Sequence, residues 1–344
     1  ACFFVALLIG NWFPRRKGTD MGIVTMAFPL VTGIGLSLCY GQFYGEIGMQ
    51  MAMGAQVPDF TLAFIKCFAP YWIAGIVALI ICGIFLKDFP EQCGAFRDND
   101  KSFTPEMAQQ MMIAEIEARK TSVWKRSKIW GCKHYWFLSL PSTLLLACAM
   151  AFMVQIIPVL NGYGEALDVL ILSDTFILLN SGPSTVLFGL AIFACFGSWF
   201  LGVLDTKYGT KTAVFITSII MLVAGILGAL DNVWCAVAAT WLLGLFMGAA
   251  SNFGLSGIVR YWRQEDFPSV YSGAPPVGTV ISAAMPFIVA AIASAFTYKG
   301  AFIFVAIMAV VCIVLNRLFN PRGIIAYDNK LREAAGLPLD DVLE

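Results

Sequence analysis

The residues in this sequence that are best suited to chemistry lie in one short polar loop, residues 202–211, between two long apolar runs. The loop has the spacing G-x-x-D-x-x-x-G-x-K. Gly202 allows two helices to approach, and Asp205 can face the positive N-terminus of a neighbouring helix. Gly209 permits a sharp turn, and Lys211 can pair with the acid or with a phospholipid head group. It is not a phosphate-binding loop, because residues 209–212 lack the adjacent Gly-Lys that such a loop requires.

A second group of candidates consists of polar side chains inside the apolar runs, which cost free energy unless they pair or face a cavity. Lys66 is the only basic residue in such a run, and it can either snorkel to the interface or bind an anion. Gln155 and Asn161 flank Pro158, where a broken helix can expose backbone groups. Asn252 follows a run of small residues, so it fits close helix packing as well as a solute contact. The remaining candidates for solute binding are Gln42, Tyr40 and Trp199.

The elements that position these residues are predicted to be membrane-spanning helices, because the composition does not fit a soluble chain. Of the 344 residues, 59% are hydrophobic and only 13% are charged, whereas about a quarter are charged in a typical soluble domain. The mean hydropathy is +0.78, and 22 basic residues balance 22 acidic ones. These values exclude a disordered chain and a nucleic-acid binder that acts through net positive charge. We therefore predict an all-α integral membrane protein.

Eight apolar stretches are long enough to cross a bilayer, since a helix needs roughly 17–25 residues to do so. They are residues 21–45, 67–86, 138–164, 175–204, 212–230, 232–259, 267–298 and 301–316 with its flanks. Residues 1–14 are apolar but too short, and we interpret them as the cytoplasmic half of a helix whose start is missing. The alternative, a signal peptide, lacks a basic n-region and an initiator Met. The sequence therefore predicts a fragment with eight full spans and a partial one.

The loops between these stretches alternate in charge, which predicts how the chain is oriented. Most Lys and Arg residues lie at 15–17, 87–133, 207–211, 260–263 and 317–332. The intervening loops carry acidic residues, namely Glu46, Asp59, Glu165, Asp168, Asp174 and Asp231, with Lys299 as the exception. By the positive-inside rule, the basic loops and the C-terminus face the cytoplasm.

The longest polar stretch, residues 87–136, divides the spans into two sets and is predicted to be a cytoplasmic linker. A surface helix is predicted in it, in which Thr104 suits the N-cap and Pro105 the first helical position. Met107, Met111 and Ala114 then form an apolar stripe along one face. The two sets of spans also resemble each other. Aromatic and basic residues at 11–16 and at 261–266 each precede a span that contains Gly and Pro.

On these residues the sequence resembles the major facilitator superfamily. The loop 202–211 looks like the family's signature motif between helices 8 and 9, and the linker lies where the family joins its two six-helix halves. Residues 12–14, 88–91 and 266–272 look most similar to the oxalate:formate antiporter-like branch. The resemblance implies a bundle of two pseudo-symmetric halves without helices 1 to 3 and most of helix 4. The implied domains are 1–86, the end of the N-terminal half; 87–136, the linker; 137–319, the C-terminal six-helix half; and 320–344, a cytoplasmic tail.

The resemblance also implies a conformational latch and a function. Gly202, Asp205, Gly209 and Lys211 would form the latch, with Asp205 against residues 19–22 at the start of helix 5. The implied function is secondary active transport of a small organic solute by alternating access. The branch is expected to hold a dicarboxylate with basic residues in helices 8 and 11, but residues 175–204 and 267–298 contain no Lys or Arg. We therefore expect a monocarboxylate-type anion or a largely apolar solute.

Other classes of protein remain as alternatives. A drug-type exporter of the same fold suits the Phe- and Met-rich spans, and a non-transporting membrane sensor can keep the same fold. A membrane-embedded enzyme is disfavoured, because the sole histidine, His134, lies in the linker and no HExxH motif occurs. We expect no metal site, cofactor or nucleic-acid partner. The expected partners are a small-molecule substrate, a coupling proton or counter-substrate, and the bilayer of the cell membrane, in which the chain is monomeric.

Overall fold

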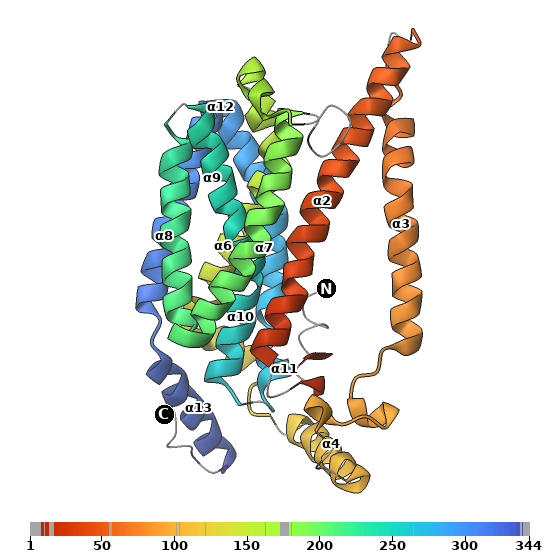
Figure 1. Ribbon diagram of the computed structural model, residues 1–344. Helices are drawn as coiled ribbons and strands as arrows, with labels where there is room; N and C mark the ends of the chain where they lie inside the picture. The colour runs from red at the N-terminus through yellow and green to blue at the C-terminus, as the bar shows by residue number, and fades with distance from the viewer. Residues whose placement is uncertain are drawn as a thin grey trace.

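A computed structural model of the chain shows a bundle of long helices and, among the residues that it describes, no strand (Figure 1). The described residues are 8–9, 11–13, 17–54, 57–100, 102, 104–120, 122–161, 163–172, 179, 181–230, 232–263, 265–337 and 339. The long helices are α2 (Lys17–Ala52), α3 (Phe60–Phe85), α6 (Lys133–Asn161), α7 (Gly182–Tyr208), α8 (Thr210–Gly228), α9 (Val233–Leu245), α10 (Met247–Tyr261) and α12 (Ala274–Leu318). Shorter elements are η1 (Pro90–Cys93), η2 (Arg97–Asn99), α4 (Pro105–Lys120), α5 (Arg126–Gly131), η3 (Gly164–Leu170), α11 (Phe267–Tyr271) and α13 (Pro321–Ala335).

Six helical segments of the described chain are long and apolar enough to cross a membrane. They are Phe60–Phe85, Lys133–Ile156, Gly182–Tyr208, Thr210–Gly228, Val233–Tyr261 and Phe267–Leu318. The last segment covers two of the predicted spans, and α2, which covers the predicted span 21–45, is not among the six. The all-helical membrane fold is therefore supported, whereas the number of eight spans stays a prediction.

Helix α12 is too long for one crossing, and a break at Thr297 divides it. A straight helix of its 45 residues would extend ~68 Å, about twice the thickness of the hydrocarbon core. Thr297 leaves helical geometry with φ 65° and ψ 176°, which separates two helices. The break lies at the boundary that the sequence predicts between residues 267–298 and 301–316.

A second interruption divides the predicted span 232–259 into α9 and α10 at Phe246, which has φ −104° and ψ 1°. Helix α7 passes very close to this point. A Cβ atom on Gly197 of α7 would lie only 1.6 Å from the carbonyl oxygen of Leu245. Glycine is therefore required at residue 197, because any larger residue would collide with the backbone of α9.

Successive loops alternate between the two ends of the bundle (Figure 1). Helices α4, α11 and α13 lie at one end, which we call the linker end, together with the turn between α7 and α8. The turn between α2 and α3, η3 and the bend within α12 lie at the opposite end. This arrangement matches the alternation of basic and acidic loops in the sequence. Which end faces the cytoplasm stays a prediction.

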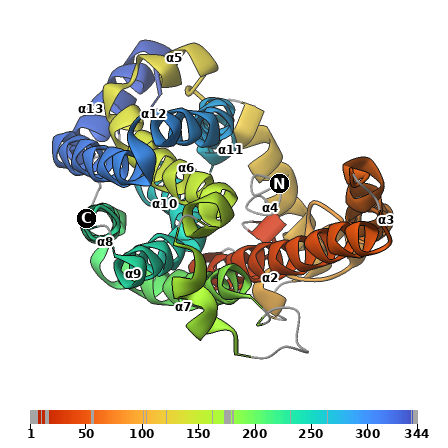
Figure 2. The same ribbon diagram turned by 90° about the horizontal axis from the view of Figure 1, so that it is seen from above.

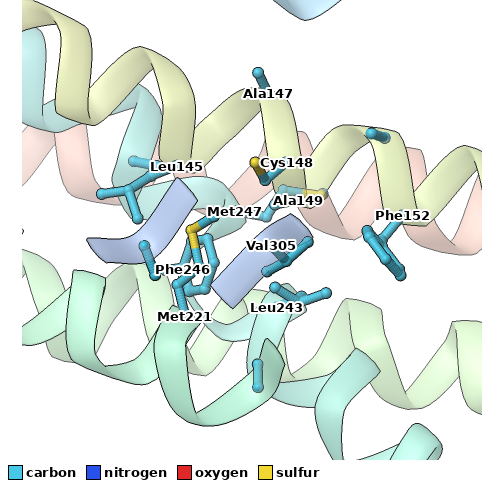
Figure 3. Packing of buried hydrophobic residues seen from close by; sticks show 14 of the residues in the cluster. Leu145, Ala147, Cys148, Ala149, Phe152, Met221, Leu243, Phe246, Met247 and Val305 are labelled. Atoms are coloured by element: carbon cyan, nitrogen blue, oxygen red, sulfur yellow. The ribbon is translucent and has the colours of Figure 1, made fainter. Parts of the chain in front are cut away.

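The core lies between α6, α8, α9, α10 and α12 and consists of closely packed apolar side chains (Figure 3). Its members include Leu145, Cys148, Phe152, Met221, Leu243, Phe246, Met247 and Val305. Helix α2 lies along α7 and α10, whereas α3 packs mainly on α2 and stands apart from the bundle (Figure 2). In the most apolar stretch of 18 residues in α3, no residue is buried.

The linker forms the predicted surface helix. Helix α4 begins at Pro105, and Thr104 Oγ1 accepts a hydrogen bond of 3.3 Å from the Met107 N–H, as an N-cap does. Met107 and Ala114 are exposed, and the side chain of Met111 lies outside the described residues.

Candidate functional site

A cavity of about 500 Å³ lies between α6, α10, α11 and the first half of α12. Most of the residues that line it are small or carry a hydroxyl group, and none of them is charged. They are Ser139, Ser142, Thr143, Leu146, Ala250, Ser251, Gly254, Ile258, Tyr271, Ala274, Pro275, Gly278, Thr279, Ser282 and Ala283. A volume of this size lies within the range of small-molecule sites.

Small residues bring the three long helices close together around the cavity. A Cβ atom on Gly254 of α10 would lie 3.4 Å from Ser142 Oγ, and one on Gly278 of α12 would lie 3.5 Å from Thr143 Oγ1. Both positions leave room for the hydroxyl groups of α6. The wall therefore combines close helix packing with a polar lining.

The backbone satisfies most of these hydroxyl groups. Ser142 and Thr143 each donate to the carbonyl oxygen of Ser139 at 2.9 Å. Ser251 and Thr279 donate in the same way to carbonyl oxygens one turn earlier, at 2.7 and 2.8 Å. A hydroxyl that donates to its own helix keeps lone pairs that can accept a hydrogen bond from a solute. The cavity thus offers polar contacts without charge.

None of the solute-binding candidates from the sequence is among the residues that line this cavity. Gln155 of α6 and Asn252 of α10 are half-buried, while Gln42 of α2 and Trp199 of α7 are exposed. The side chains of Tyr40 and Asn161 lie outside the described residues. The cavity lining itself could have been found from hydroxyl residues at helical spacing, such as Ser139, Ser142 and Thr143 on one face of an apolar run.

Lys66 is held by an acid of the neighbouring helix. Its Nζ lies 2.5 Å from Glu46 Oε1, which joins α3 to α2. The side chain of Lys66 is 53% exposed and that of Glu46 only 16%. The nearby carboxylate compensates the charge of Lys66, which weakens the case for an anion at this position.

Asp205 is buried at the turn between α7 and α8, where Thr210 begins α8 and Ser256 and Arg260 of α10 surround it. Its Oδ1 atom has no hydrogen-bond partner within the described chain. Asp205 thus lies in the last turn of α7, close to the N-terminus of α8, and its role in a latch stays a prediction. The side chains of residues 19–22, its predicted partners, lie outside the described residues.

The two glycines of this loop have different environments. Gly209 has φ 88°, which favours glycine, and a Cβ atom there would lie 3.2 Å from the Arg260 guanidinium. A Cβ atom on Gly202 would meet no described atom within 4 Å. The expected close approach of two helices at Gly202 therefore stays a prediction. The close contact of α7 with α9 is made at Gly197.

Lys211 binds the C-terminal end of α12. Its Nζ donates to the carbonyl oxygen of Phe319 at 2.7 Å, and Asn316 Nδ2 donates back to the Lys211 carbonyl at 2.9 Å. This side chain therefore satisfies a carbonyl group that the end of the helix leaves free.

Comparison with known proteins does not assign the chain to a family. No family model matches it, and no curated protein matches it. One solved structure, of a variant of the fucose:proton symporter FucP from E. coli, has 13% sequence identity and a TM-score of 0.46. The similarity covers 93% of this chain and 90% of that chain. A likeness of this size does not establish a common fold, so the major facilitator superfamily stays a resemblance.

Proposed function

We propose that the chain is part of a secondary active transporter that moves a small organic solute across a membrane by alternating access. The observation that carries this proposal is the cavity between α6, α10, α11 and α12, because it lies within a bundle of apolar helices. An uncharged polar cavity inside such a bundle suits a solute that is bound, released and not chemically changed. The signature loop 202–211 and the alternation of the loops support the same function.

The lining of the cavity limits the charge of the solute. A dianion needs positive counter-charges when it leaves water, and no described lining residue supplies one. Hydroxyl groups can bind a singly charged carboxylate or a neutral solute with much smaller loss. We therefore propose a monocarboxylate-type solute, with a proton or a counter-substrate as the coupled species and with a monomer as the working unit.

Counterflow in proteoliposomes tests this function. Proteoliposomes that contain the complete gene product are loaded with unlabelled solute. They are then exposed to labelled formate, lactate, pyruvate, oxalate and a neutral polyol. We expect accumulation of a monocarboxylate and none of oxalate. Accumulation of the polyol alone would correct the proposed charge but keep transport, whereas no exchange of any solute, including drug-like ones, would contradict transport.

A pair of variants on α12 connects transport to the cavity. Ser282→Phe places a ring in the cavity and is expected to reduce counterflow at least about tenfold. Ser294→Phe is the matched control, since Ser294 lies on the same helix but is exposed and outside the lining. Equal activity of the two variants would show that the solute does not use this cavity.

A further inference from the structure

A buried arginine joins the C-terminal helix to the short helix that leads into the cavity. Arg332 of α13 is only 4% exposed, and its Nη2 lies 3.3 Å from Asp266 Oδ2 at the start of α11. Its Nε donates to Asp328 Oδ2 at 2.8 Å, and Glu265 lies at 3.5 Å. A buried guanidinium is costly unless it is paired, so these carboxylates hold Arg332 in place.

The linker completes the same network from a third side. Ser122 Oγ donates to Asp266 Oδ1 at 2.5 Å, and Trp124 Nε1 donates to Asp328 Oδ1 at 2.7 Å. The carboxylates of Asp266 and Asp328 therefore each bind Arg332 with one oxygen and the linker with the other. Burial raises the pKa of Asp266, while the hydrogen bond from Ser122 and the charge of Arg332 oppose that change.

The far end of α11 is held as firmly as its beginning. The hydroxyl group of Tyr135 on α6 donates to the carbonyl oxygen of Val270 at 3.1 Å. A Cβ atom on Gly273 would lie 2.9 Å from Ile129 of α5. Helix α11 is thus fixed at both ends by contacts outside the cavity.

Helix α11 is also part of the cavity wall. Tyr271 lines the cavity, and Ala274 and Pro275, at the start of α12, line it as well. Asp266 is five residues before Tyr271, about one and a half helical turns. A displacement of Asp266, the residue before α11, would therefore be transmitted to the wall.

We propose that Arg332 is a positioning residue for the solute cavity: α13, together with the linker, clamps α11 and so sets the shape of the wall that Tyr271, Ala274 and Pro275 form. The effect on solute affinity rests on the proposed function. The position of α11, which Arg332 holds through Asp266, does not depend on the proposed function. Arg332 touches no residue that lines the cavity in the contacts described above, and it acts through Asp266.

The test compares Arg332→Gln, Arg332→Lys and the control Arg322→Gln in the full-length protein. Arg322 lies on the same helix but is exposed. Hydrogen–deuterium exchange is measured for residues 266–283, with residues 210–228 of α8 as an internal reference. We expect Arg332→Gln to speed exchange in residues 266–283 on the order of tenfold, Arg332→Lys to restore part of the protection, and Arg322→Gln to change nothing.

Transport kinetics give the second readout. With a transported solute, Arg332→Gln should raise KM on the order of tenfold while the maximal rate stays within about twofold. Exchange that is unchanged, or that rises equally in α8, would overturn the clamp. Local exchange with an unaltered KM would keep the clamp but overturn its effect on the cavity, and the absence of any transported solute would contradict only the proposed function.

Discussion

At the scale of single residues, Asp205 shows how much of the environment of a charged side chain can be predicted from the sequence. The spacing of residues 202–211 predicts an acid that can face the N-terminus of a neighbouring helix, and Asp205 lies in the last turn of α7, close to Thr210 at the beginning of α8. Its neighbour Arg260 could not be predicted, because 55 positions separate the two residues and only the packing of α10 brings them together. Lys211 was equally unpredictable, since its partner Phe319 is 108 positions away.

We predict that Asp205→Asn slows transport on the order of tenfold and leaves solute affinity within about twofold. A carboxylate at a helix N-terminus stabilises the arrangement in which it is buried there, so its loss alters the balance between conformations. The measurement is turnover in proteoliposomes together with equilibrium binding. Lys207→Gln, an exposed position in the same turn, is the control. A normal rate for Asp205→Asn would remove the case for a latch.

At the scale of the helices, the apolar runs predict where the elements lie but not where they touch. The runs place most helix ends within a few residues, and Thr104 and Pro105 correctly mark the start of α4. The contacts depend on which glycine faces a neighbour, and a run of apolar letters does not show this. Gly197 and Gly202 occupy the same helix, yet among the described atoms only Gly197 comes close to another backbone.

We predict that Gly197→Ala destabilises the protein by about 1–3 kcal/mol, because its methyl group would overlap the Leu245 carbonyl and force α7 away from α9. Gly202→Ala should instead be neutral or stabilising by up to about 1 kcal/mol, since alanine favours helix and the space is open. Thermal unfolding of the purified protein in detergent measures both. Equal unfolding temperatures for the two variants would contradict the close contact.

At the scale of the whole molecule, the alternating loops are the feature that the sequence predicts best. Basic and acidic loops separate because each crossing reverses the side on which the chain emerges, and the described loops follow this order (Figure 1). The cavity could not be predicted in the same way. Its lining comes from four helices, and the polar residues that are most conspicuous in the sequence, such as Lys66 and Gln155, lie elsewhere.

We predict that the linker end faces the cytoplasm, and Cys93 provides a native probe. Cys93 is exposed in the linker, so a membrane-impermeant maleimide should label it in inside-out vesicles but not in right-side-out ones. Val57→Cys, at an exposed position between α2 and α3, should give the reverse pattern. Peptide mass spectrometry identifies the labelled sites. Labelling of Cys93 in right-side-out vesicles would reverse the proposed orientation.

The ion pair between Glu46 and Lys66 also bears on how the chain is made. A lysine at the centre of a span costs about 2.5–3.5 kcal/mol when the translocon inserts the helix into lipid, and Lys66, six residues after the start of α3, carries part of that cost. Glu46 precedes Lys66 by 20 residues, so α2 is synthesised before the lysine emerges from the ribosome. If the two helices enter the bilayer together as a hairpin, the charges meet during insertion, and α3 crosses without an uncompensated lysine. We therefore expect α2 and α3 to insert as one unit during biosynthesis.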